Sequence, residues 1–222
     1  MKKSAPPAKP LRQKNLRDPE ATREALMQAG SELFAARGFD GVPVEAIAER
    51  AGANKAMINY HFGGKRGLYK AIVIESFQEL GTAVRAIVQG PGTPPRQIGQ
   101  FVDFVLELGT TRRLAFPALF LREALSAEAP DPDVLPVVGG VVQAITGIIA
   151  KGIQDGSFRP MDPLLAYFTL ISPIALFLAT APLRRRAYED GLIPFAPPSP
   201  KDFATHVKET LLRGMRSDKE RS

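Results

Sequence analysis

The run Ala51–Phe62 constrains this chain more than any other stretch of its sequence. It reads AGANKAMINYHF, and Gly63 and Gly64 follow it directly. Gly52 favours a turn, Asn54 is a good N-cap, and the glycine pair stops a helix. The pattern therefore predicts a helix of roughly seven residues, which is marginal by itself in water. Such a helix must be held by a larger fold that needs it to be short.

A helical projection separates two faces of this short helix. At about 100° per residue, Ile58 and Phe62 fall together on a face that would anchor the helix to the body. The opposite face carries Ala56, Asn59 and Tyr60, flanked by Lys55, Met57 and His61. Asn can pair with adenine, Ala can approach a thymine methyl, and Tyr and Lys can reach phosphates. An ordinary exposed face is the alternative, but it would be richer in Glu and Lys.

The charge of the chain is unevenly placed. Residues 1–70 hold 13 Lys and Arg against 7 Asp and Glu, whereas the remaining residues hold 16 of each. The whole net charge of +6 therefore lies in the first third. A basic segment joined to a neutral body is typical of a polyanion-binding module attached to a second domain. For the first 17 residues, a solvated basic tail without a partner is the alternative.

The composition excludes several classes of chemistry. The chain has no cysteine, so disulfides, thiolate catalysis and cysteine-based zinc sites are excluded. Its two histidines, His61 and His206, are far apart, so we expect no metal site and no cofactor. No phosphate loop, dinucleotide fingerprint or nucleophile elbow occurs, and a helical enzyme is a remote alternative. The first 17 residues lack the apolar core of a signal peptide, so a cytoplasmic protein is expected.

Helix-period patterns fill the rest of the chain and predict an all-α protein of about nine helices. We expect a disordered basic arm over residues 1–18, a DNA-binding domain of three helices over 19–74 and a larger helical domain over 75–222. Proline and glycine loops bound the expected helices, which run from Pro19 to Gly38, from Pro43 to Gly52, from Lys65 past Leu80, over Gln97–Arg113, Pro117–Glu128 and Val137–Asp155, from Pro163 to Leu183 and from Pro200 to Met215.

One segment raises the alternative of a membrane anchor. Pro163–Leu183 has 21 residues without a charge, and three arginines follow it. That length suffices to cross a bilayer, and the flanking charge resembles an anchor. The run also contains two threonines, a serine and internal prolines, and a helix apolar on all sides equally suits a buried or dimer-interface position.

Residues 19–73 resemble the helix-turn-helix domain of the TetR family of bacterial transcriptional regulators. The matching residues are Ile47-Ala48-Glu49-Arg50-Ala51-Gly52, then Tyr60-His61-Phe62, then Lys65 and Leu68-Tyr69, with no insertion between them. The resemblance implies that Gly52 is the turn and that Lys55–His61 is the recognition helix. The DNA-contacting set that we expect is Pro43, Val44, Asn54, Lys55, Ala56, Met57, Asn59, Tyr60, His61 and Lys65.

The chain departs from the family pattern at the DNA-reading positions. Many members have Thr or Ser at the start of the second helix, whereas Val42, Pro43 and Val44 stand here. Met57 replaces a frequent Thr, and Asn59 replaces a frequent Tyr. The operator sequence of this protein therefore cannot be inferred from the operators of relatives.

The resemblance also implies a homodimer that binds a palindromic operator on double-stranded DNA, is paired through residues 163–183 and 200–215, and represses transcription until a small molecule releases it. Helix-spaced aromatics that suit an apolar effector pocket are Phe101, Phe104, Phe116, Phe120, Tyr167 and Phe168, with an ordinary core as their alternative. A DNA-binding adaptor or activator that responds to a protein partner is the alternative function.

Overall fold

The structure is a computed structural model, and it describes residues 18–109 and 132–217. Within these ranges the chain is helical and forms no strand, apart from an isolated bridge between Phe158 and Arg216. The all-α prediction is therefore confirmed. The predicted helix Pro117–Glu128, with Phe116 and Phe120, lies outside the described residues. The elements are α1 (Pro19–Arg37), α2 (Val44–Ala51), α3 (Ala56–Phe62), α4 (Lys65–Gln89), α5 (Pro94–Leu108), α7 (Leu135–Gln154), α8 (Pro163–Ala179), α9 (Ala181–Glu189), α10 (Pro200–Val207), a π-helical turn η1 (Lys208–Leu212) and α11 (Arg213–Met215).

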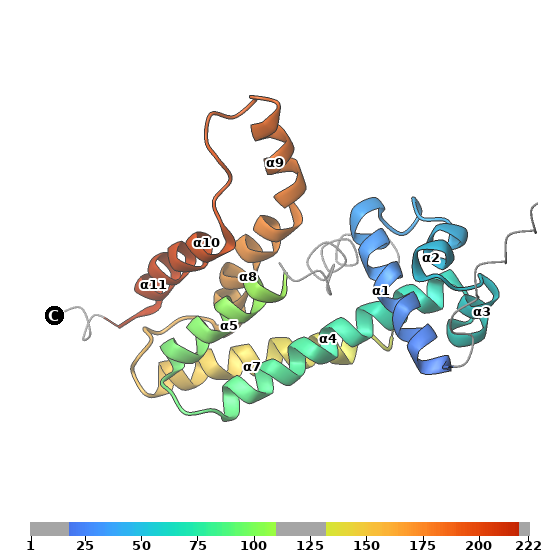
Figure 1. Ribbon diagram of the computed structural model, residues 1–222. Coiled ribbons are helices and arrows are strands. Elements are labelled where there is room, and N and C mark those ends of the chain that lie inside the picture. Colours follow the sequence, from blue (N-terminus) through green and yellow to red (C-terminus); the bar gives the residue numbers. More distant parts are fainter. Residues whose placement is uncertain (1–17, 110–131, 218–222) are drawn as a thin grey trace, which may run out of the picture.

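The helices form two bodies that share α4 (Figure 1). A small hydrophobic core joins α1, α2 and α3 to the first two turns of α4 and ends at Ile72. A larger core begins one residue later, at Val73, and joins the rest of α4 to α5, α7, α8 and the C-terminal helices. Because α4 runs unbroken for 25 residues through both cores, it is a direct mechanical link between them.

Three aromatic rings pack together where the two bodies meet. The ring of Tyr69 on α4 lies edge-on to Phe34 of α1, with centroids 5.4 Å apart, and to Phe39, at 5.2 Å. Tyr69 contacts both hydrophobic cores. Edge-to-face aromatic pairs have a preferred geometry, so this cluster sets the position of α1 on α4.

Local sequence signals account for several helix starts. Asp18 and Asp162 each accept two backbone N–H bonds in the first turn of the helix that follows. Ser199 and Asp202 form a reciprocal capping box at α10. The starts predicted at Pro163 and Pro200 are thus confirmed, because each proline stands just inside a capped helix.

Other predicted boundaries are wrong. Pro43 precedes the second helix as its cap and does not open it. The fifth helix begins at Pro94 rather than Gln97 and ends at Leu108, and the seventh begins at Leu135 rather than Val137.

The apolar run predicted as one helix, Pro163–Leu183, is broken. Helix α8 ends at Ala179, and α9 leaves it at an angle of 48°. Pro182 in the first turn of α9 explains the break, because proline has no N–H to donate to the carbonyl of Leu178.

Two parts of the described chain are long and apolar enough to cross a membrane. One is α7, and the other is the bent pair of α8 and α9. Both α7 and α8 contribute buried residues to the larger core, among them Ile145, Ile149, Leu170 and Ile174. Part of each helix therefore lies in the protein core, which is also a setting for apolar helices.

Candidate nucleic-acid interface

The turn between α2 and α3 has the geometry that its glycines predict. Gly52 ends α2 in the left-handed region at φ 63°, and Gly63 ends α3 in the same region at φ 69°. Helix α3 starts at Ala56, whose N–H donates to the Asn54 side-chain oxygen at 2.9 Å. The Asn54 side chain therefore accepts a bond from the start of α3, but the residue directly before the helix is Lys55, so the N-cap was predicted one residue too early. Between the two glycines, α3 is confined to seven residues.

Helix α3 is anchored by one side and open on the other. Ile58 is fully buried in the small core, and Phe62 packs partly against it. The Arg23 guanidinium of α1 lies 5.7 Å from the centre of the Phe62 ring. These contacts fix the rotation of α3, because only its Ile58 side meets the body.

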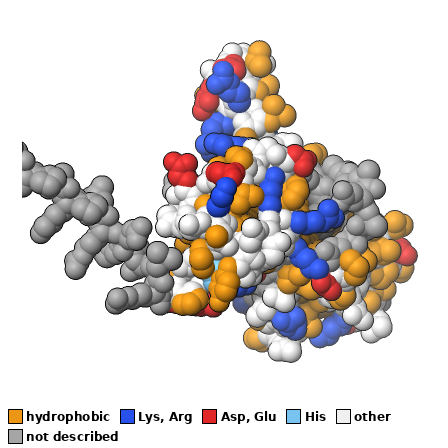
Figure 2. Space-filling view, turned by 90° about the vertical axis from the view of Figure 1, so that its right-hand side faces the viewer, with side chains coloured by type: hydrophobic (Ala, Val, Ile, Leu, Met, Phe, Trp, Pro, Cys, Tyr) orange, Lys and Arg blue, Asp and Glu red, His pale blue; other side chains and the backbone are white. Residues whose placement is uncertain are grey.

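The structure gathers the predicted reading residues of α3 on its outward side. Tyr60 is 75 % exposed, and Lys55, Ala56 and Asn59 are also exposed. Met57 and His61 are half-buried at the flanks. The His61 ring lies between those of Tyr60 and Phe62, at 4.9 and 6.0 Å. Figure 2 faces the end of the molecule that carries this domain and shows basic and hydrophobic side chains interspersed over it.

An ion pair that sequence reasoning missed holds Lys55. Its ammonium lies 3.4 Å from the Glu45 carboxylate of α2. Hydrogen bonding to the backbone, and then to Lys55, lowers the pKa of Glu45. Both side chains are exposed, so a phosphate can compete with Glu45 for the ammonium. Pro43 is exposed and Val44 half-buried at the start of α2, beside this pair.

The start of α4 forms a second cationic feature. Lys65 is its first residue, and the Lys65 ammonium lies 4.4 Å from the centre of the Phe39 ring. Arg66 follows, and the first turn contains no acidic residue. Free N–H groups and the helix dipole at such an end favour an anion. The ring contact positions Lys65 beside this end without neutralising its charge.

A narrow apolar cavity lies in the larger body, between α4, α5, α7 and α8. Its free volume of about 20 Å³ is enough for one water molecule. Tyr167 has the only polar side-chain group among the described lining residues, and burial raises the pKa of its hydroxyl to about 12. The lining residues are Phe77, Leu80, Phe101, Val105, Val138, Val141, Tyr167, Ile171, Ala175 and Leu178.

The predicted pocket aromatics divide between different environments. Tyr167 lines the cavity, whereas Phe104 is half-buried at the edge of the core. Phe168 does not line the cavity; it points outward and is 53 % exposed, because the next residue along a helix lies about 100° away from its neighbour. Sequence reasoning missed Phe77 and Leu80 because their spacing on α4 is that of any core residue.

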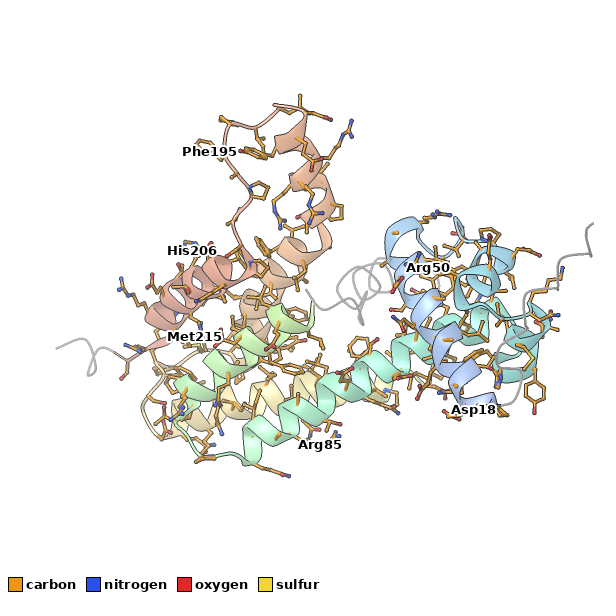
Figure 3. The ribbon with its side chains drawn as sticks, viewed as in Figure 1. Asp18, Arg50, Arg85, Phe195, His206 and Met215 are labelled. Atoms are coloured by element: carbon orange, nitrogen blue, oxygen red, sulfur yellow. The ribbon has the colours of Figure 1, made fainter. Side chains whose placement is uncertain are left out.

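The described residues contain no group of three or more His, Asp or Glu side chains placed to hold a metal ion. His206 lies exposed on α10 (Figure 3).

The fold and the exposed short helix define a helix-turn-helix protein with a second helical body. Residues 26–72 match the family described as bacterial regulatory proteins, tetR family. The chain is 27 % identical over 154 residues to the HTH-type transcriptional regulator RutR of Escherichia coli, covering 68 % of this chain and 70 % of RutR. It is 24 % identical over 210 residues to the HTH-type transcriptional repressor NicS of Pseudomonas putida, and the match covers 89 % of this chain and 93 % of NicS.

Among solved structures, the fold is similar to that of the transcriptional regulator FadR from Bacillus subtilis, in complex with stearoyl-CoA. The TM-score is 0.69 at 17 % identity, over 87 % of this chain and 99 % of that one. Residues 26–72 are therefore a DNA-binding domain of the TetR family, and the relatives that match most of the chain are transcriptional regulators.

Proposed function

We propose that this protein is a homodimeric repressor that binds a palindromic operator and is released by a small apolar effector. The observation that carries the proposal is the outward face of α3, where Asn59 and Tyr60 are exposed on a helix anchored by the buried Ile58. Residues 19–74 are the proposed DNA-binding domain, and residues 75–222 the effector and dimerisation domain.

The proposed DNA contacts are of two kinds. Ala56 and Asn59 face outward along α3, Met57 lies half-buried at its flank, and the three would read base edges in the major groove. Tyr60, Lys55 and Lys65 would contact phosphates, which position the protein without specifying sequence. Pro43, Val44, Asn54 and His61 border this surface.

The proposed dimer uses the outward side of α8. Leu164, Leu165, Phe168 and Leu176 are all exposed there, between 47 % and 67 %. Residues 210–215 lie beside this side of α8, because Leu165 and Leu211 line the same groove. A two-fold pairing through this surface places two α3 helices on one palindromic site, with half-sites about one helical turn apart.

The proposed effector site is the cavity lined by Phe77 and Tyr167. An effector larger than a water molecule must push the surrounding helices apart, because the cavity is narrow. Helix α4 lines the cavity with Phe77 and Leu80 and begins at Lys65 beside α3. Effector binding would therefore move the DNA-binding domain and lower its DNA affinity. The name of NicS supports repression, and the ligand of FadR supports an acyl effector.

The DNA-binding assignment predicts different effects of two neighbouring substitutions. Lys65→Ala should weaken binding to all sequences alike and lower the slope of log affinity against log salt by about one. Asn59→Ala should cost about 1–3 kcal/mol at one base position and relax the preference there. The measurement is fluorescence anisotropy, at several salt concentrations, with DNA recovered by selection from a random pool and with single-base variants.

Equal effects of both substitutions on every sequence would contradict the role given to Asn59. Failure of the selection to enrich any sequence at moderate salt would contradict the operator-binding function itself.

The effector assignment predicts that filling the cavity abolishes the response to ligand. Val138 lines the cavity and is half-buried, so part of the ring of Val138→Phe can fill the small cavity while the rest of the ring lies toward solvent. In the wild type, a panel of fatty acids and acyl-CoA thioesters should contain a compound that releases the selected DNA. Val138→Phe should bind the DNA normally and respond at least roughly tenfold more weakly.

Val88→Phe, an exposed position on α4 outside the cavity, is the matched control and should respond as the wild type does. An unchanged response of Val138→Phe would place the effector elsewhere. No response to any compound, together with release by a protein partner, would favour the adaptor or activator.

A further inference from the structure

Residues 181–199 form an arm that projects from the larger body. The arm consists of α9 and the loop that returns to α10, and it stands clear of the other described helices (Figures 1 and 2). No residue between 181 and 199 is buried. A helix of nine residues that buries nothing is marginal by itself.

The arm carries large hydrophobic side chains that are open to solvent. Leu183 is 67 % exposed, Tyr188 45 %, Leu192 76 % and Phe195 77 %. Phe195 lies on the returning loop, away from the body (Figure 3). Isolated exposed hydrophobic residues are ordinary, but four on a segment without any buried residue indicate a surface that binds something.

The arm is nevertheless fixed at its base. The Arg184 guanidinium lies 4.1 Å from the centre of the Phe177 ring, and that ring stacks on Phe203 of α10 with centroids 3.9 Å apart. Arg184 also donates a hydrogen bond to the Thr180 hydroxyl. These contacts connect α8, α9 and α10, so the direction in which the arm projects is set by the fold.

The far end of the arm also has a defined shape. Arg186 pairs with Asp190 at 2.6 Å, and Gly191 adopts a φ of 70° that turns the chain back. The Leu192 N–H then donates to the Ala187 carbonyl at 2.8 Å. The turn therefore holds Leu192 at the end of α9, which lowers the ordering cost of packing this side chain on a partner.

The arm continues the apolar surface proposed for dimerisation. Helix α9 follows α8 directly, and α8 has six exposed residues, while residues 200–215 have eight. A stable interface uses roughly 20–30 residues on each side, so α8 and α10 to α11 alone fall short. The exposed residues of the arm supply the missing surface.

The described residues also contain a candidate surface for receiving the arm. Beside α8 lies an open groove of about 320 Å³, lined mostly by apolar side chains. Its apolar lining consists of Met161, Leu165, Ala166, Leu170, Leu211 and Met215.

We propose that the arm of each protomer packs on a second copy of this chain, with Leu192 and Phe195 buried against the partner's α8 and the adjoining groove. The acceptor surface comprises residues 159–176 and 210–215 of that copy. The inference rests on the homodimer proposed above and adds a reciprocal clasp to it. Each arm holds the other protomer, so the hydrophobic side chains left open in one chain are covered in the pair.

The absence of cysteine allows a direct crosslinking test. Leu192→Cys is labelled with a benzophenone maleimide, and ¹⁴N-labelled and ¹⁵N-labelled full-length protein are mixed before illumination. We expect crosslinks between the two isotopic forms that fall within residues 159–176 or 210–215. Arg85→Cys, an exposed position on α4, is the control and should give no crosslink to that surface. Crosslinks of Leu192→Cys that stay within one chain would overturn the clasp.

Charge substitutions at the arm test its contribution to assembly. Leu192→Asp with Phe195→Asp should raise the dimer dissociation constant roughly tenfold or more, since buried aromatic anchors dominate interface energies. Sedimentation at several concentrations measures it. Both side chains are exposed, so the fold should persist, and Val88→Asp on α4 is the matched control.

The outcomes separate the clasp from the dimer. If the double variant of Leu192→Asp with Phe195→Asp dimerised as tightly as the wild type, the clasp would be overturned but the proposed homodimer would not. A wild type that stays monomeric throughout would overturn both. Arm-dependent binding to vesicles of anionic phospholipid, with dimerisation unchanged, would also overturn the clasp and indicate a lipid surface as its partner.

Discussion

Gly67→Ala is expected to abolish specific DNA binding without any loss of a DNA contact at residue 67. A Cβ atom at this position would lie 1.7 Å from the Phe62 carbonyl oxygen and 2.9 Å from its carbon. Both atoms belong to the backbone of the last residue of α3, so no side-chain rotation relieves the clash. The junction between α3 and α4 must open by more than an ångström, which moves the reading face of α3.

The affinity for selected DNA should fall by more than about tenfold, since each displaced base contact is worth about 1–3 kcal/mol. Overpacking of this kind also lowers the free energy of unfolding by about 1–3 kcal/mol. Anisotropy titration and denaturant unfolding measure the two quantities separately.

Gly81→Ala in the same helix is the control. A Cβ there meets only the end of Arg85 at 3.4 Å and Val141 at 3.9 Å. Alanine favours a helix over glycine by about 1 kcal/mol, so this variant should be as stable as the wild type or slightly more so. Wild-type DNA affinity in Gly67→Ala would refute the geometry of the α3–α4 junction.

Ile58→Ala should destabilise the DNA-binding domain by about 2–5 kcal/mol. Ile58 is fully buried and is the only buried side chain on α3. A helix of seven residues has little stability of its own, so the loss of this anchor should release α3 before the rest of the fold. Amide hydrogen exchange should show faster exchange over Ala56–Phe62, while α5 and α7 remain protected.

Met57→Ala is the matched comparison for Ile58→Ala. Met57 is the preceding residue on α3 and is half-buried, so its truncation should leave exchange over α3 close to that of the wild type. If Ile58→Ala and Met57→Ala had equal effects on exchange, Ile58 would not be the anchor.

The elements that sequence predicts best are those with strong local signals. Asp162 before Pro163 and Ser199 before Pro200 each combine a capping side chain with a proline that fits only the first turn. The break at Thr180 was missed because Pro182 lies inside an apolar run whose composition suits one continuous helix. Pro182 has no N–H, and the lost backbone hydrogen bond ends α8 there.

The proposed site could be predicted in part for a similar reason. The faces of α3 follow from helical periodicity, and the burial of Ile58 and exposure of Asn59 agree with it. Contacts between helices leave no such trace in the sequence. The ion pair of Lys55 with Glu45 depends on how α2 packs on α3. The place of Phe77 and Leu80 in the cavity lining depends on how α4 packs on α7.

The most direct test of the central claim, that two α3 helices enter successive major grooves, is methylation interference on the selected DNA with dimethyl sulfate. This reagent methylates guanine N7 in the major groove and adenine N3 in the minor groove. The account predicts interference at guanines in two symmetric clusters centred about 10 base pairs apart, since dimeric helix-turn-helix proteins bind half-sites one helical turn apart. Interference confined to adenine N3, or a single unsymmetric cluster, would contradict it.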